Sequence, residues 1–395
     1  MKNLLKIIIV AGFVTASFNS LAADWTITQS ADITTTNLTQ LSLDQGVTTA
    51  VSNSRQAING VVLNGAEDDL VSGSQTAPIL ARALDMNQDG QTTVGSSQAI
   101  NHIAARNIGA TGATGLVRQT GVMTGVLLMT QKAGAGNNVQ GGNVMVTSST
   151  GNIVNAAQEL TITNEINLGQ EIGSNTNNVQ ALNLADTTAN SSGTVDTLVQ
   201  SFDHTGANGL TLSSRNAASG NVQAGNMVDS LGSITDLRQT FSFLNSSLGF
   251  FNLVGTGSSN IQAGNMARTD GTGSVIVEIS QTFTGSSRDN VFTMSPFAGP
   301  TVSELVQAGN LIDIGQGAIT DLTDHQVFST EGTMTMTQTG GVVDSLQALN
   351  AITDKTGGSA ATQARQSLTA SGAFSMDQRV ATTSGQFGNF AGLRR

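Results

Sequence analysis

The sequence Val222-Gln223-Ala224-Gly225-Asn226-Met227-Val228 returns almost unchanged twice further along the chain. The second copy is Ile261-Gln262-Ala263-Gly264-Asn265-Met266-Ala267, and the third is Val306-Gln307-Ala308-Gly309-Asn310-Leu311-Ile312. Looser copies keep only a Gln followed three residues later by an Asn. The nine pairs are Gln56 and Asn59, Gln98 and Asn101, Gln140 and Asn143, Gln180 and Asn183, Gln223 and Asn226, Gln262 and Asn265, Gln307 and Asn310, Gln347 and Asn350, and Gln386 and Asn389. Successive Gln residues lie 39 to 45 positions apart, so the chain consists of repeats of about 41 residues.

Each repeat also contains a second Gln-centred element, such as residues 236–241 or 277–283. It divides the repeat into two subunits of about 20 residues, and a third short apolar run often follows, as at residues 333–337. These runs alternate or are β-branched and end at Gly, Asn, Ser or Asp, which predicts strands of four to seven residues. Residues 77–86, which include Pro78, are the only stretch whose pattern suggests a short helix.

A fixed period with the same residue types at the same phase favours an all-β, elongated β-solenoid of about nine imperfect repeats. Each turn would stack on the previous one at about 4.8 Å, with like residues above like. Gln and Asn gain most, because a carboxamide carries both a donor and an acceptor and can form a continuous ladder. Gly225, Gly264 and Gly309 suit a bend or a positive φ between the Gln and the Asn.

The first residues have the pattern of a signal peptide. Lys2 and Lys6 precede an apolar run at residues 7–18, and Ser20-Leu21-Ala22 matches a cleavage site. We therefore expect a signal peptide at residues 1–22 and a solenoid domain at residues 23–395. Within that domain, residues 23–97 form irregular first repeats, residues 98–382 regular repeats, and residues 383–395 a truncated terminal repeat. The expected location is extracellular or on the outer cell surface.

Composition limits the partners. The formal charge of −11 becomes −13 when Lys2 and Lys6 are removed, which argues against nucleic acid and anionic membrane surfaces as partners. The apolar run is too short to span a bilayer, so no membrane span is expected. The chain has no Cys, no Tyr and one Trp, and only 11% of its residues are charged. Stability must therefore come from burial and hydrogen bonding rather than from disulfides.

The repeats resemble those of curlin-type functional-amyloid fibre subunits, in which stacked strand-turn-strand units carry Ser, Gln, Gly and Asn at set positions. The Gln-x-Gly element of that resemblance stands at Gln140-Gly142, Gln223-Gly225, Gln262-Gly264, Gln307-Gly309 and Gln386-Gly388. Here Asn follows Gly directly, whereas curlin has two residues between them, and the repeat is a doubled unit. The resemblance implies a secreted protein that polymerises with itself, with a secretion or nucleation partner.

One short segment matches part of a calcium-binding loop. Asp85, Asn87 and Asp89, followed by Gly90, place oxygen ligands at positions one, three and five and Gly at position six. Position twelve is Ser96 rather than Glu, so the alternative interpretation is an Asx-rich turn. Calcium is the one ligand that the sequence suggests, and no other cofactor is expected.

The sequence therefore predicts a structural protein that self-assembles into an extracellular fibre or biofilm matrix. One alternative is a cell-surface adhesin or surface-layer solenoid that does not polymerise. Another is a carbohydrate-active β-helix enzyme, but the acidic residues are scattered and no nucleophile motif is present, so no enzymatic activity is expected.

Overall fold

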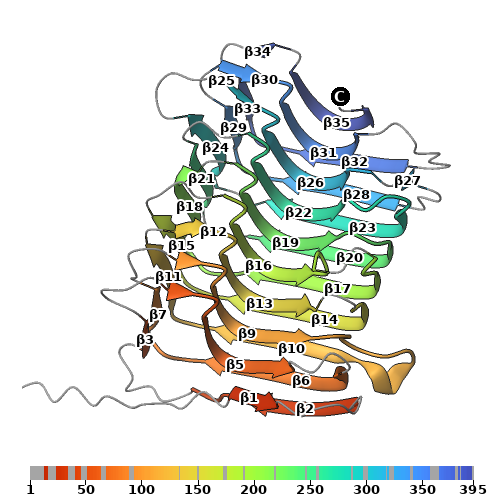
Figure 1. Ribbon diagram of the computed structural model, residues 1–395. Coiled ribbons are helices and arrows are strands. Elements are labelled where there is room, and N and C mark those ends of the chain that lie inside the picture. The colour runs from red at the N-terminus through yellow and green to blue at the C-terminus, as the bar shows by residue number, and fades with distance from the viewer. Residues whose placement is uncertain are drawn as a thin grey trace, which may run out of the picture.

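The computed structural model describes residues 13–16, 24–33, 41–45, 51–63, 68–88, 93–132, 134–148, 151–171, 176–189, 192–217, 219–244, 247–254, 258–285, 288–296, 301–316, 318–319, 324–338, 341–355, 364–378, 381–382 and 384–393. They form parallel strands that stack in chain order, from the red N-terminal strands to the blue C-terminal ones in Figure 1. The only helical element among the described residues is one 3-10 turn, η1 (Ala113–Gly115). The predicted elongated all-β solenoid is confirmed.

Three long parallel sheets, A, B and C, run along the solenoid. Sheet A carries the Gln-x-x-Asn motif and contains β1 (Phe13–Ala16), β5 (Arg55–Leu63), β9 (Ser97–Ala105), β13 (Val139–Thr147), β16 (Val179–Asp186), β19 (Val222–Ser230), β22 (Ile261–Thr269), β26 (Val306–Ile314), β31 (Leu346–Asp354) and β35 (Gly385–Leu393). Sheet B carries the second Gln and contains β2 (Asp24–Ser30), β6 (Asp69–Ile79), β10 (Val117–Met123), β14 (Ile153–Ile162), β17 (Val195–His204), β20 (Ile234–Phe243), β23 (Val275–Gly285), β28 (Asp324–Thr330) and β32 (Ala364–Ala370).

Sheet C is built from the third run of each repeat. It contains β3 (Leu41–Gln45), β7 (Ala83–Gln88), β11 (Val126–Lys132), β15 (Ile166–Glu171), β18 (Leu210–Ala217), β21 (Leu248–Val254), β24 (Asn290–Pro296), β29 (Met334–Gln338) and β33 (Phe374–Gln378). Two small sheets lie in the connections from sheet C to sheet A. One has the order β12 (Gly134–Gly136), β8 (Thr93–Val94) and β4 (Val51–Ser52), and the other β25 (Thr301–Ser303), β30 (Gly341–Val343) and β34 (Ala381–Thr382). A further short strand, β27 (Ala318–Ile319), pairs with β23.

Each 41-residue repeat therefore makes one coil, that is, one turn with a strand in each of sheets A, B and C. The two 20-residue subunits correspond to the sheet A and sheet B elements, and the third run adds a third strand. The repeats pair in register, so Gln223 lies beside Gln180 on one side and Gln262 on the other. We call a set of residues related by such in-register pairs a column.

The sheet A strand breaks its alternation at the motif. A regular strand would point Gly225 and Asn226 to opposite faces. Here the Asn226 amide reaches a carbonyl of sheet B, and a side chain on Gly225 would overlap the ring of Phe241, also on sheet B. The pairing of β19 with β22 passes from Ala224 to Asn226 and omits Gly225. The predicted bend between Gln and Asn is this local break.

The motif glycines are required for packing rather than for backbone freedom. None of Gly225, Gly264 and Gly309 belongs to the described glycines with positive φ, so that part of the sequence interpretation is wrong. A Cβ on Gly264 would lie 2.2 Å from Phe283 Cδ2 and 2.7 Å from the Gly309 carbonyl oxygen. The three glycines thus make room for a stack of phenylalanines on sheet B.

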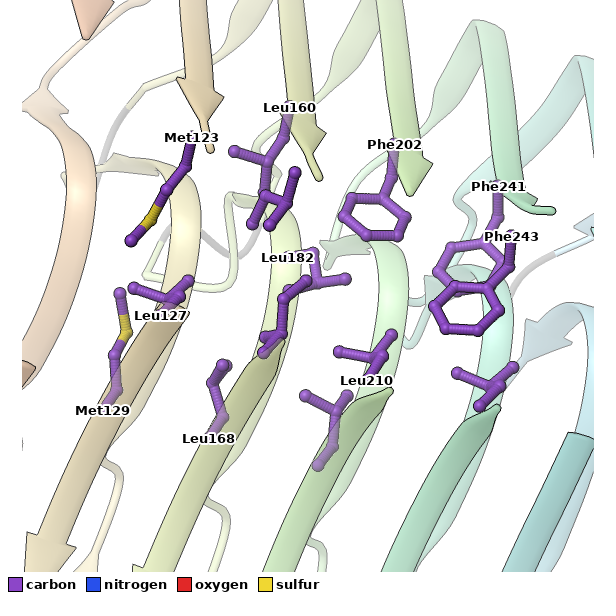
Figure 2. Close-up of a cluster of buried hydrophobic side chains, with 14 of the residues drawn as sticks. Met123, Leu127, Met129, Leu160, Leu168, Leu182, Phe202, Leu210, Phe241 and Phe243 are labelled. Atoms are coloured by element: carbon purple, nitrogen blue, oxygen red, sulfur yellow. The ribbon is translucent and has the colours of Figure 1, made fainter. Parts of the chain in front are cut away.

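That stack is the centre of the main hydrophobic core. Ring centroids lie 5.1 Å apart between Phe202 and Phe241, 5.3 Å between Phe241 and Phe283, and 4.7 Å between Phe283 and Phe328. Figure 2 shows Leu160, Phe202 and Phe241 on successive strands, facing the interior together with side chains of sheet C. Core columns therefore tolerate changes between aliphatic and aromatic residues, provided that the facing position adjusts.

The suggested short helix at residues 77–86 is not present. Ala77 and Pro78 belong to strand β6, which ends at Ile79, and β7 begins at Ala83. Pro78 pairs in register with Val122 of β10, and its carbonyl accepts a hydrogen bond from the Ile33 amide. Tertiary stacking on neighbouring coils therefore decides the conformation against the local pattern.

Gly264→Ala should destabilise the protein by about 1–3 kcal/mol, because the added methyl group overpacks against Phe283 and the next strand. Gly169→Ala is the matched control, since the added Cβ would lie 3.7 Å from the nearest atom. This substitution should leave the free energy of unfolding nearly unchanged. Thermal and urea unfolding of both variants would measure the difference. Equal stability of the two variants would contradict this explanation of the motif glycine.

Candidate functional site

The nine Gln residues of sheet A form one continuous ladder of side-chain hydrogen bonds. In every coil from Gln98 to Gln386, the Nε2 donates to the Oε1 of the Gln in the preceding coil, at 2.8–2.9 Å. The donor thus always points towards the N-terminal end of the solenoid. All nine predicted Gln positions are brought together as the sequence indicated.

The second hydrogen of each amide ties sheet A to sheet C. Gln223 Nε2 donates to the Leu212 carbonyl at 2.9 Å, and Gln262 Nε2 donates to the Phe250 carbonyl at 3.0 Å. From Gln98 to Gln347, the Nε2 group therefore donates both along the column and across the coil. Such full use of the amide matters because an unpaired polar group in the interior costs about 1–3 kcal/mol.

The nine Asn residues form a second ladder, which runs in the opposite direction. From Asn59 to Asn350, each Nδ2 donates to the Oδ1 of the Asn in the following coil, at 2.8–2.9 Å. The same Nδ2 also donates to a sheet B carbonyl, for example from Asn226 to Thr240 at 2.8 Å. The two ladders of one strand therefore tie it to both of the other sheets.

Sequence reasoning did not assign further ladders that the structure contains. Sheet B has a complete Gln ladder, with Nε2 to Oε1 distances of 2.7–2.9 Å, made of Gln29, Gln75, Gln119, Gln158, Gln200, Gln239, Gln281, Gln326 and Gln366. Their Nε2 atoms reach sheet A carbonyls, as from Gln239 to Met266 at 2.9 Å. Asn178, Asn221 and Asn260 add a shorter ladder. The recurring Gln of the second element and the Asn two residues before the motif Gln were the available signals.

Burial changes sharply at the last coil. The ladder residues from Gln56 to Asn350 are all buried, and none is more than 8% exposed. Gln386 and Asn389 on β35, by contrast, are exposed. Phe374 and Phe387 in the same terminal region are 42% and 40% exposed. The ladders therefore end on accessible amides beside accessible apolar side chains.

A charged column follows the Asn ladder on sheet A. Asp186, Asp229, Arg268 and Asp313 occupy successive coils. Burial would lower the pKa of Arg268, but its ion pair with Asp229 raises it. Lys355 Nζ lies 3.4 Å from Asp313 Oδ2. Burial, together with the neighbouring Asp229, raises the pKa of Asp186. Arg268 thus lies between two carboxylates of opposite charge, Asp229 and Asp313, whereas Asp186 has the like-charged Asp229 as its neighbour in the column.

The candidate calcium residues lie on a strand rather than in a loop. Asp85 and Asn87 belong to β7 and share its half-buried face, opposite Leu84 and Met86. Asp89 lies outside the described residues. Across the part of the chain that is described, no cluster of three or more His, Cys, Asp or Glu side chains could hold a metal ion. The calcium site stays a prediction.

His102 is a buried titratable group on sheet A. It lies between Gly60 and Val144 of its column, and among the described residues its Nδ1 has no hydrogen-bond partner. Burial, with a further contribution from Arg55, lowers the pKa of His102 to about 3. The imidazole is therefore held neutral by the stack around it.

Comparison with known proteins adds no relative. No protein-family model matches the chain, and neither a curated protein nor a solved structure shows significant similarity to it. In the described segments there is also no helix of the length and apolarity needed to cross a membrane.

Lowering the pH should destabilise the protein through His102. Because its folded pKa is depressed below 6.5, the unfolded state binds the proton first, and stability falls as the pH drops from about 6.5 towards 3. This group contributes a loss of about 2 kcal/mol between pH 7 and pH 5. His102→Val, which copies Val144 of the same column, should remove that part of the pH dependence. Urea unfolding of both proteins at the two pH values measures it, and identical pH dependence would count against the burial of a neutral His.

The calcium prediction has a direct check. If Asp85, Asn87 and Asp89 bind the ion, added calcium should raise the melting temperature by mass action, and the rise should vanish in Asp89→Ala. If neither calcium nor a chelator changes the melting temperature, these residues serve only as part of a strand and its turn.

Proposed function

We propose that this chain is an exported structural protein that self-assembles end to end into an extracellular fibre or matrix. The observation that carries the proposal is the termination of the amide ladders on exposed groups. Gln386 and Asn389 each bond to the coil before them, at 2.9 and 2.8 Å, and are exposed on the other side. A further coil, supplied by another copy, would continue both ladders.

The physical driving force is the same at the end as inside. Strand β35 pairs with β31 on one side, and among the described strands it is the last of sheet A at the C-terminal end. An unprotected edge of this kind is a template for another chain. The exposed rings of Phe374 and Phe387 would add apolar burial. Pairing between strand edges needs no catalytic centre, and we propose no enzymatic activity.

The extracellular location rests on the expected signal peptide at residues 1–22. Export would bring the solenoid to a compartment where other copies are its neighbours, with a secretion or nucleation partner acting before assembly. The net negative charge of the chain argues against nucleic acid as a partner, so we propose none.

Charges at the exposed end should stop assembly without unfolding the chain. We expect Gln386→Lys with Asn389→Lys to retain the circular dichroism spectrum and to slow fibre growth at least tenfold, because like charges would have to be buried at the joint. The matched interior pair is Gln262→Lys with Asn265→Lys. It should lose more than about 3 kcal/mol of stability, since both positions are fully buried. Light scattering, electron microscopy and thioflavin binding follow fibre growth.

Two outcomes would change the proposal. Wild-type protein that stays monomeric at high concentration for days would favour a solenoid adhesin that does not polymerise. Fibres that grow unaffected by the two Lys substitutions at the C-terminal end would place the joint elsewhere on the molecule.

A further inference from the structure

The two ends of the solenoid contain complementary sets of strands. At the N-terminal end, β2 and β3 begin sheets B and C. At the C-terminal end, β35 extends sheet A by one strand beyond the coil that holds β32 and β33, the last described strands of the other sheets. A second copy whose β2 and β3 continued sheets B and C would therefore share one coil with β35. The sheet order would pass through the joint without a gap.

In the coil that contains β2 and β3, the sheet A position is occupied by β1, a short strand of the same chain. Strand β1 pairs with β5 over four residues, from Phe13 beside Gly60 to Ala16 beside Leu63. At the other end, β35 pairs with β31 over eight positions. In the described residues β1 does not reach Arg55–Asn59 of β5, the part that carries the amide pair. The described residues of β1 thus pair with four positions of β5, compared with the eight positions over which β35 pairs with β31.

The polarity of the ladders matches across such a joint. Each Gln donates to the preceding coil, so Gln56 would donate to Gln386 Oε1, the exposed end of the column. Within the described residues, Gln56 Nε2 donates to the Leu43 and Asn87 carbonyls, which are its cross-coil partners. Each Asn donates to the following coil, so Asn389 Nδ2 would donate to Asn59 Oδ1.

The side-chain sizes are complementary in the same register. Phe387 and Phe390 pair with Ala348 and Ala351, and their ring centroids lie 4.8 Å apart. On β5 the equivalent positions are Ala57 and Gly60, the latter the smallest residue of its column. A pair of rings on one end would therefore meet a pair of small residues on the other. In β1 the residue at the Gly60 position is also a phenylalanine, Phe13.

We infer that β35 of one copy pairs in parallel with β5 of a second copy, with Gln386 beside Gln56 and Phe390 beside Gly60, and that β1 occupies the same edge and competes with it. This inference rests on the proposed function and names its joint. Cleavage after residue 22, as the sequence predicts, would remove β1 and uncover the whole of β5. The joint would then be regulated by the N-terminal segment of the receiving copy.

The register can be tested by disulfide cross-linking, because the chain has no Cys of its own. Ser30 and Ser367 are exposed and lie in one column of sheet B, at its first and last strands. Across the joint their Cα atoms would lie at the inter-strand spacing of about 4.8 Å, which a disulfide can bridge. The control pair is Ser30 with Thr369, also exposed, two residues out of register and thus roughly 8 Å away.

Ser30→Cys with Ser367→Cys should give a series of covalent multimers when assembled protein is oxidised. Ser30→Cys with Thr369→Cys should give at least tenfold fewer, although it assembles equally well. Ser201→Cys with Thr240→Cys, neighbours in the same column within one chain, should cross-link in the monomer and so validates the geometry. Fibres in which the in-register pair fails, or in which both intermolecular pairs react equally, would overturn the inference and leave the proposed function standing. A chain that never assembles would overturn both.

The competition by β1 is tested on the full chain with a reversible lock. Val14 pairs with Val61, so Val14→Cys with Val61→Cys should fix β1 on β5 when oxidised and release it when reduced. We expect growth at least tenfold slower in the oxidised form, with recovery on reduction. Val14→Pro, which removes a backbone donor from β1, should shorten the lag of growth. If neither the disulfide nor the Pro substitution changes the rate or the lag of fibre growth, the proposed competition by β1 is wrong.

Discussion

The structure depends on the complete pairing of carboxamides that lie where water cannot reach them. A buried amide is costly unless both of its hydrogens and its oxygen find partners. Here each interior Gln of the sheet A ladder donates one hydrogen to the neighbouring coil and one to a facing sheet, as Gln262 does with Gln223 and Phe250. A nonpolar residue in one coil would leave the amides above and below it short of a bond. That constraint keeps the columns in phase over the full length of the chain.

The residue types in the apolar columns vary much more, because core packing requires matched side-chain volumes rather than identical residues. One interior column of sheet B contains Ala77, Leu160 and Phe202 in different coils. Where this column holds Phe241 or Phe283, the residue before the motif Asn on sheet A is a Gly. In a third kind of column, oppositely charged side chains rather than identical ones lie beside each other, as Arg268 does beside Asp229. A coil can therefore vary its core and its turns as long as its amides keep their register.

The same constraint links the fold to assembly. Inside the solenoid every coil is both donor and acceptor to its neighbours, whereas β35 presents one half of each ladder to solvent. The N-terminal end carries the other half on β5, where the described residues of β1 pair with Gly60–Leu63. The two ends differ in hydrogen-bond polarity and in side-chain size, and this asymmetry is the reason that we propose a head-to-tail joint.

The sequence by itself determined the period, the β content, the stacking of like residues and all eighteen amides of the two sheet A ladders, because in-phase Gln and Asn are satisfied only by their own copies. It did not reveal the partly polar column of sheet C, in which Ser214, Asn252 and Met294 interrupt the series of Gln residues. Only the tertiary structure decided that a coil has three strands, that Gly264 is small because of Phe283, that residues 77–86 are extended, and that β1 lies on β5. Those features depend on contacts between unlike residues, within a coil or at an edge, and such contacts leave no periodic trace in the sequence.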